Sequence, residues 1–109
     1  MTTRVYVAGP YTADPERCTA EAVQVGSVLL ALGFAPFVPH LSHYWQTLHH
    51  QHDYEDWMRL DLAWVEAADV LLRIPGESPG ADREVEHAAA HGVPVVSSVE
   101  RLVEWEAQR

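Results

Sequence analysis

Short apolar runs alternate with longer stretches of helical periodicity along most of the chain. The apolar runs are rich in β-branched residues and end at glycine, proline or a polar turn, which is typical of strands buried on both faces of a sheet. They cover residues 4–8, 34–38, 70–74 and 93–97. Pro36 lies inside the second run and predicts a strand at the sheet edge, because proline cannot donate to a central ladder.

The stretches between these runs carry the signals that start and stop helices. Asp14-Pro15 is typical of an N-cap followed by the first helical residue, and Gly33 is typical of a stop. Helices are predicted up to Leu32, over residues 54–67, around Glu84 up to His91, and over residues 99–108. This alternation predicts an α/β fold: a small doubly wound, flavodoxin- or Rossmann-like parallel sheet with strand order 2-1-3-4 and helices on both faces.

The stretch from Ser78 to Ala88 joins the third strand to the next helix and carries the main candidate for chemistry. Prolines and glycines break the pattern here, so a loop should cross the carboxyl end of the strand, where open α/β sheets bind ligands. On a helical wheel Glu84 falls at the border of the packed face, from which its carboxylate can point into a cleft. The helix dipole should keep it ionised, as a nucleophile or general base needs. The alternative is that Asp82 and Glu84 are ordinary acidic residues near a helix start.

Asp61 is a second anomaly. The helix over residues 54–67 has a broad apolar face around Trp57, and Asp61 lands in the middle of that face. Burying an unpaired carboxylate costs on the order of several kcal/mol, so an inward-pointing one normally has a partner or a function. Two interpretations stay open: a functional carboxylate, or one that caps a buried backbone N–H or pairs with an arginine.

The predicted topology brings these candidates together. The carboxyl ends of strands one and three flank the point where the strand order reverses. The turn Gly9-Pro10-Tyr11 and the loop from Ser78 through Gly80 to Glu84 should therefore share one crevice. The helix that carries Asp61 leads into strand three and can form a wall of it.

Residues 40–52 contain five of the seven histidines and are expected to form a loop or an irregular segment. A zinc site is one interpretation, because Asp53, Glu55 and Asp56 follow closely. The spacing disfavours it, since His40 and His43 are not four residues apart on a recognisable helix and no cysteine pair accompanies them. We therefore expect no metal and a polar, substrate-facing or pH-sensitive segment, with His43 as its candidate contact.

The charge balance narrows the class of partner. Sixteen acidic residues against seven arginines and no lysine give a net charge of −9. That balance disfavours a nucleic-acid polymer, because such binding depends on neutralising phosphates. A small anionic ligand is compatible with it, since backbone N–H groups at a helix start hold a phosphate without a net positive field.

A chain of 109 residues with no linker or repeat is expected to form one domain over residues 1–109. The single Cys18 excludes an intrachain disulfide and indicates a reducing compartment. Residues 1–10 lack the pattern of a signal peptide, and no apolar run approaches membrane-spanning length. We therefore expect a cytoplasmic protein without membrane contact.

Three motifs stand in a specific order on the predicted elements: Tyr6-Val7-Ala8-Gly9-Pro10, Asp61-Leu62-Ala63-Trp64 ahead of Ala68-Asp69-Val70, and Ser78-x-Gly80-x-x-x-Glu84. With these motifs the chain resembles the nucleoside 2-deoxyribosyltransferase family over nearly its whole length, from Val5 to Val96. Within that family it is most similar to small bacterial and phage relatives of unassigned function and to the deoxynucleoside 5′-monophosphate N-glycosidases.

The resemblance implies roles for the residues that are unusual on physical grounds. The nucleophile falls on Glu84, the carboxylate that acts on the leaving base or the sugar falls on Asp61, and the tyrosine that orients the nucleophile falls on Tyr6. The implied reaction is attack of the glutamate on C1′ of a deoxyribosyl group, followed by transfer to another base or to water, without a cofactor. This matches the retaining scheme of two cooperating carboxylates.

The resemblance also bears on substrate and assembly. Ser78 matches a serine that contacts phosphate in the monophosphate hydrolases, whereas Pro10 replaces their phosphate-binding serine. The implied partner is a small nucleoside or nucleotide, in a homodimer or higher homo-oligomer. Four tryptophans in so short a chain favour an interface at the Trp45 and Trp57 region or at the final helix. The rival interpretation is a binding module in which Glu84 orients a ribose hydroxyl without turnover.

Overall fold

Four parallel strands in the order β2-β1-β3-β4 form the centre of the protein, in a computed structural model that describes residues 1–109. The strands are β1 (Arg4–Ala8), β2 (Ala35–Phe37), β3 (Val70–Arg73) and β4 (Val95–Val96). Tyr6 of β1 pairs with Phe37 of β2 on one side and with Leu71 of β3 on the other. The α/β fold class and the strand order are confirmed, and the strand with Pro36 lies at the edge as predicted.

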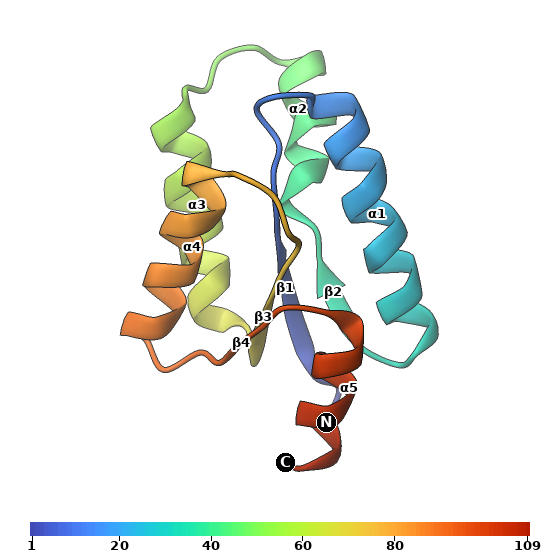
Figure 1. The fold of residues 1–109 in the computed structure, drawn as a ribbon. Helices are drawn as coiled ribbons and strands as arrows, with labels where there is room; N and C mark the ends of the chain where they lie inside the picture. The colour runs from blue at the N-terminus through green and yellow to red at the C-terminus, as the bar shows by residue number, and fades with distance from the viewer.

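The helices cover both faces of the sheet, as Figure 1 shows. The helices are α1 (Pro15–Ala31), α2 (Ser42–Leu48), α3 (Tyr54–Ala67), α4 (Pro79–Ala90) and α5 (Val99–Ala107). α1 and α5 pack on the face to which Val5 and Val7 point, whereas α3 and α4 pack on the face of Tyr6 and Ala8. This alternation follows from the two-residue period of a strand. None of the helices has the length and apolar character needed to span a bilayer.

Side-chain caps fix where most helices begin. Asp14 accepts a hydrogen bond from the backbone N–H of the third helical residue of α1, and Asp53 does so for α3. Such caps satisfy N–H groups that have no partner within the helix. The predicted starts of these two helices are confirmed. Gly33, with φ of +93°, follows the end of α1, and this left-handed conformation explains its predicted role as a stop.

Three predicted boundaries were wrong. Residues 40–52 are irregular only from residue 49 onward, because a 3₁₀ turn over Pro39–Leu41 leads into α2. The helix predicted around Glu84 begins earlier than the expected loop allowed, because Ser78 is the N-cap of α4 and Pro79 occupies its first position, where proline's missing N–H costs nothing. The fourth strand comprises only two residues of the predicted five.

The cap of α5 offers a test of the fold near the C-terminal end of the chain. Ser98 Oγ accepts a hydrogen bond of 3.1 Å from the backbone N–H of Arg101. Replacing Ser98 with alanine should lower the free energy of unfolding by about 1 kcal/mol, whereas aspartate should largely keep the cap. Urea unfolding measures this, with the neighbouring Ser97→Ala as the control. Equal losses for Ser97→Ala and Ser98→Ala would contradict the cap.

Candidate active site

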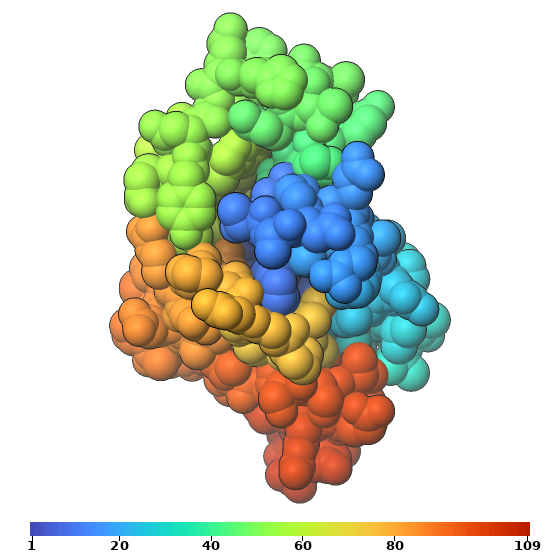
Figure 2. All heavy atoms as spheres, turned by 45° about the horizontal axis from the view of Figure 1, so that its top comes forward, coloured from blue at the N-terminus to red at the C-terminus, as the bar shows by residue number.

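A cavity of about 270 Å³ opens at the carboxyl ends of β1 and β3. This volume is near the lower end of the roughly 300–1,000 Å³ of small-molecule sites. In Figure 2 the hollow lies between the β1–α1 loop, the segment of α2 and α3, and the β3–α4 connection. The turn after β1 and the stretch from Ser78 to Glu84 therefore share one crevice, at the reversal of strand order where it was predicted.

Glu84 and Tyr6 form a buried pair at the base of this cavity. The Tyr6 hydroxyl donates a hydrogen bond of 2.6 Å to Glu84 Oε2. The Tyr6 side chain is fully buried and Glu84 is 5% exposed, yet the glutamate lines the cavity. Burial raises the pKa of Tyr6 well above its usual value, and the nearby carboxyl groups add to this effect, so the phenol keeps its proton and donates.

The ionisation predicted for Glu84 was wrong. Burial raises its pKa to about 7, although the hydrogen bond from Tyr6 and the positive charge of Arg73 act in the opposite direction. The sequence pattern placed Glu84 at the border of the packed face, but the structure buries it with Ala81 and Ala88. Desolvation of the carboxylate outweighs the favourable end of the helix dipole, so the proton is half lost near neutral pH.

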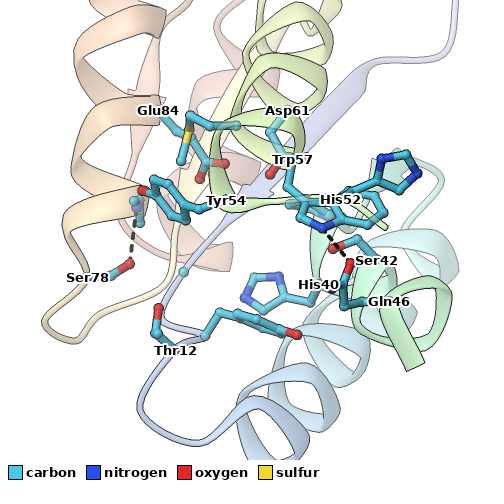
Figure 3. Close-up of a pocket in the computed structure, with 16 residues that line it drawn as sticks. Thr12, His40, Ser42, Gln46, His52, Tyr54, Trp57, Asp61, Ser78 and Glu84 are labelled. Atoms are coloured by element: carbon cyan, nitrogen blue, oxygen red, sulfur yellow. Dashed lines mark hydrogen bonds between the residues drawn. The ribbon is translucent and has the colours of Figure 1, made fainter. Parts of the chain in front are cut away.

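Asp61 points into the same cavity from α3, as Figure 3 shows. Burial raises its pKa to about 8, and the charge of Glu84 contributes to the shift. The predicted direction of this pKa shift is confirmed. Asp61 forms no ion pair with an arginine and accepts no hydrogen bond from a backbone N–H, so neither structural alternative applies. Two carboxyl groups with raised pKa values in one cleft are typical of a functional site.

Four of the six predicted substrate-binding residues line the cavity: Gly9, Tyr11, Ser78 and Gly80. The other two lie behind this lining. The Pro10 carbonyl is 3.0 Å from His40 Nε2, and His43 Nδ1 is 2.8 Å from the Tyr11 hydroxyl. His43 therefore positions Tyr11 and does not reach the cavity itself.

The two loops at this rim are in tight contact. Gly76, in the β3–α4 connection, has φ of +127°, a conformation that side chains rarely adopt. A Cβ atom on Gly76 would lie 2.6 Å from Pro10 Cγ. Arg73 donates to the carbonyls of Ile74 and Gly76 and to Asp82 Oδ1, which holds the connection against α4.

The opposite wall includes part of the predicted substrate-facing segment, residues 40–52, although its candidate contact His43 is not in the lining. His40, Gln46, Tyr54, Trp57 and Met58 also line the cavity. Trp57 Nε1 donates a hydrogen bond of 2.9 Å to Gln46 Oε1, which links α3 to the unpredicted α2 (Figure 3). His40 is buried, burial lowers its pKa, and its Nδ1 has no hydrogen-bond partner in the protein. Trp57 could have been found from the sequence, because it lies on the same helix face as Asp61.

Comparisons with known proteins support this fold. The model of a family described as a domain of unknown function (DUF7768) matches residues 3–98. No curated protein matches the sequence. A 2-desoxiribosyltransferase from Leishmania mexicana has a TM-score of 0.66 at 19% identity, over 87% of this chain and 63% of that one.

A 2-deoxyribosyltransferase from the psychrotolerant bacterium Bacillus psychrosaccharolyticus has a TM-score of 0.64 at 20% identity, over 85% of this chain and 69% of that one. The chain thus spans less than two thirds of the first of these two structures and slightly more of the second. At such identities the likeness establishes the fold, and at that level it confirms the predicted resemblance.

The raised pKa values predict how stability depends on pH. Asp61 and Glu84 hold their protons more tightly in the folded protein than in an unfolded chain, where their pKa values are the ordinary 3.8 and 4.5. Their contribution is therefore complete below about pH 4 and is lost as pH rises through about 7 and 8. A pKa unit corresponds to about 1.4 kcal/mol, and partial exposure and coupling reduce the total. Between pH 5 and 9 the native protein should lose about 1–2 kcal/mol more stability than Asp61→Asn.

Urea unfolding at several pH values measures this difference. Glu86→Gln, an exposed residue of α4 outside the cavity, is the matched control and should follow the native profile. Parallel profiles for the native protein and Asp61→Asn would show that Asp61 titrates as an ordinary carboxyl group.

Proposed function

Because the chain belongs to the DUF7768 family, which is described only as a domain of unknown function, we propose its activity from the geometry of the crevice. The protein cleaves the N-glycosidic bond of a nucleoside, a deoxynucleoside or the corresponding 5′-monophosphate. Glu84 is the nucleophile, and the glycosyl group passes to water or to another base. No cofactor takes part in this scheme.

One observation carries the proposal: a buried Glu84 that lines the cavity, is held at 2.6 Å by Tyr6, and has Asp61 as a second carboxyl group in the same space. Two carboxyl groups with separate roles are what glycosyl transfer with a covalent intermediate requires. The two similar structures, both named as 2-deoxyribosyltransferases, have this fold and support the same reaction class.

The proposed first step uses each of the three groups differently. The ionised Glu84 attacks C1′ through one carboxylate oxygen, while Tyr6 donates to the other. The bond from C1′ to the base nitrogen breaks as Asp61 delivers its proton to the leaving base. In the second step the Asp61 carboxylate takes a proton from water or from an incoming base, whose oxygen or nitrogen then displaces Glu84 from C1′.

The lining supports the proposed substrate class. The rings of Tyr54 and Trp57 offer apolar surface for a planar base. Ser78 Oγ accepts a hydrogen bond of 3.1 Å from the Ala81 N–H, so its own hydroxyl hydrogen is free to bind a phosphate oxygen at the start of α4. His40 Nδ1 is a further polar atom available to a substrate.

The pKa of Glu84 favours a second candidate function. With a value of about 7, the side chain is protonated in half of the molecules at neutral pH, and a neutral carboxyl group can donate a hydrogen bond to a ribose hydroxyl. In this alternative the crevice binds a nucleotide without turnover.

The cytoplasmic location and the homo-oligomer stay proposals. Trp45 is half exposed and contacts Trp57, with ring centroids 5.1 Å apart, which supports an aromatic interface at this position. Sedimentation velocity at micromolar concentration would show a single monomeric species if the interface does not form.

The activity is tested with a panel of nucleosides, deoxynucleosides and their 5′-monophosphates. Glu84→Ala should abolish base release, and Asp61→Asn should slow it by about two to four orders of magnitude, the usual scale for loss of a general acid. Tyr6→Phe should have a smaller effect, since the nucleophile remains. The control Glu86→Gln should retain full activity. If the native protein releases base no faster than Glu84→Ala but is thermally stabilised by the same compounds, it is a binding module.

The two pKa values predict a narrow pH optimum. The value of kcat/KM should rise up to about pH 7 as Glu84 ionises, and it should fall above about pH 8 as Asp61 loses its proton. Both limbs belong to the coupled pair, so the asparagine variant at position 61 should lack the alkaline limb. An alkaline limb that persists in this variant would assign the acid to another group.

A further inference from the structure

Three potential metal ligands converge outside the crevice, on the surface where α3 and α4 pack together. Glu66 lies in the last turn of α3, and His87 and His91 lie at the end of α4. Their ligand atoms all lie within 4.8 Å of one another. Neither the cavity nor the proposed activity uses these side chains.

The two histidines have the spacing of metal ligands on a helix. Residues four apart lie on one helix face, and the imidazole rings of His87 and His91 are 4.1 Å apart between centroids. His91 Nδ1 is 2.9 Å from the His87 carbonyl oxygen. A carbonyl only accepts hydrogen bonds, so this nitrogen carries the hydrogen and the lone pair of a neutral His91 lies on Nε2. A hydrogen bond of this kind orients many metal-binding histidines.

Glu66 supplies the third ligand. Its Oε2 atom is 2.7 Å from His87 Nε2 and 3.8 Å from His91 Nε2. No arginine forms an ion pair with Glu66, and the chain has no lysine to compete for it. In a tetrahedral zinc site, bonds of about 2.0–2.2 Å place neighbouring ligand atoms about 3.4 Å apart. The two measured separations lie on either side of this value, so small side-chain rotations bring these atoms to metal-ligand spacing. His87 Nε2 now donates a hydrogen bond to Glu66, and a bound metal replaces the hydrogen on that nitrogen, which leaves as a proton.

We propose that Glu66, His87 and His91 bind a divalent transition metal of the zinc type, with water in the fourth position. Two imidazoles and one carboxylate suit this class of ion, whereas Mg²⁺ and Ca²⁺ prefer oxygen ligands. The histidines of residues 40–52, whose spacing disfavoured a zinc site, form no group of three converging ligands.

The metal ties together the two helices that carry the carboxyl groups of the crevice. Glu66 follows Asp61 by little more than one helical turn, and His87 follows Glu84 by slightly less than one. At the other end of the same helix pair, Arg83 forms an ion pair of 2.8 Å with Glu55. Metal binding therefore fixes the separation of α3 and α4 at their C-terminal ends, where no arginine forms an ion pair between them.

Calorimetric titration of Zn²⁺ into the untagged, chelator-treated protein tests this proposal without any substrate. One ion should bind per chain, and saturation should raise the melting temperature by about 5 °C or more. His87→Ala, His91→Ala and Glu66→Gln should each weaken Zn²⁺ binding by at least roughly 10- to 100-fold. A loss of that size is typical when a residue that only supports a metal ligand is removed, and loss of a ligand itself should cost no less. The variants' circular dichroism without metal should match that of the native protein, since all three side chains are at the surface.

The double variant His49→Ala/His50→Ala is the matched control, because it removes two exposed histidines of the histidine-rich segment. It should bind Zn²⁺ as tightly as the native protein does. With a dissociation constant of about 1 µM, a tenfold excess of Zn²⁺ over 10 µM protein should nearly saturate the site. The proposal is overturned if the native protein binds no ion under these conditions. It is equally overturned if binding persists in His87→Ala/His91→Ala or is lost in the control.

Discussion

The hydrogen bond between Tyr6 and Glu84 links the central strand to the helix that follows β3. Each of the two groups would be costly to bury alone, because a phenol needs an acceptor and a carboxyl group needs a donor. Their pairing depends on Tyr6 pointing to the face covered by α4, which the pleat of β1 and its register against β3 ensure. The position of the crevice thus follows from strand pairing as much as from the residues that line it.

Most of the fold could be predicted because its signals are local. Apolar runs of strand length, Asp14-Pro15 at the start of α1, and the helical face around Trp57 each act within one element. α2 escaped prediction because it has only seven residues, no buried side chain and no capping side chain. Its helical state depends on packing against α1 and the preceding 3₁₀ turn, which the sequence pattern does not contain.

The sequence predicted the composition of the site and the raised pKa of Asp61, but not the raised pKa of Glu84. Sequence pattern and family resemblance both led to Glu84 and Asp61, since a carboxyl group on a packed helix face is unusual. The depth of burial of Glu84 could not be derived from α4 alone, because α3 and β1 provide the atoms that exclude water. For the same reason, the part of the lining that comes from Gln46 and His40 required the three-dimensional arrangement of distant segments.

The contact of Gly76 with Pro10 has a consequence for how a ligand reaches the crevice. The loops after β1 and β3 meet so closely that neither can shift without displacing the other, so together they form a rigid rim. The opposite rim, from α2 to the start of α3, exposes much of Trp45 and Tyr54 and is held to the rest by side chains such as Gln46. Tyr54 of this aromatic rim lines the cavity and is half exposed, so changes there should alter the rates of ligand exchange more than the bond-breaking step.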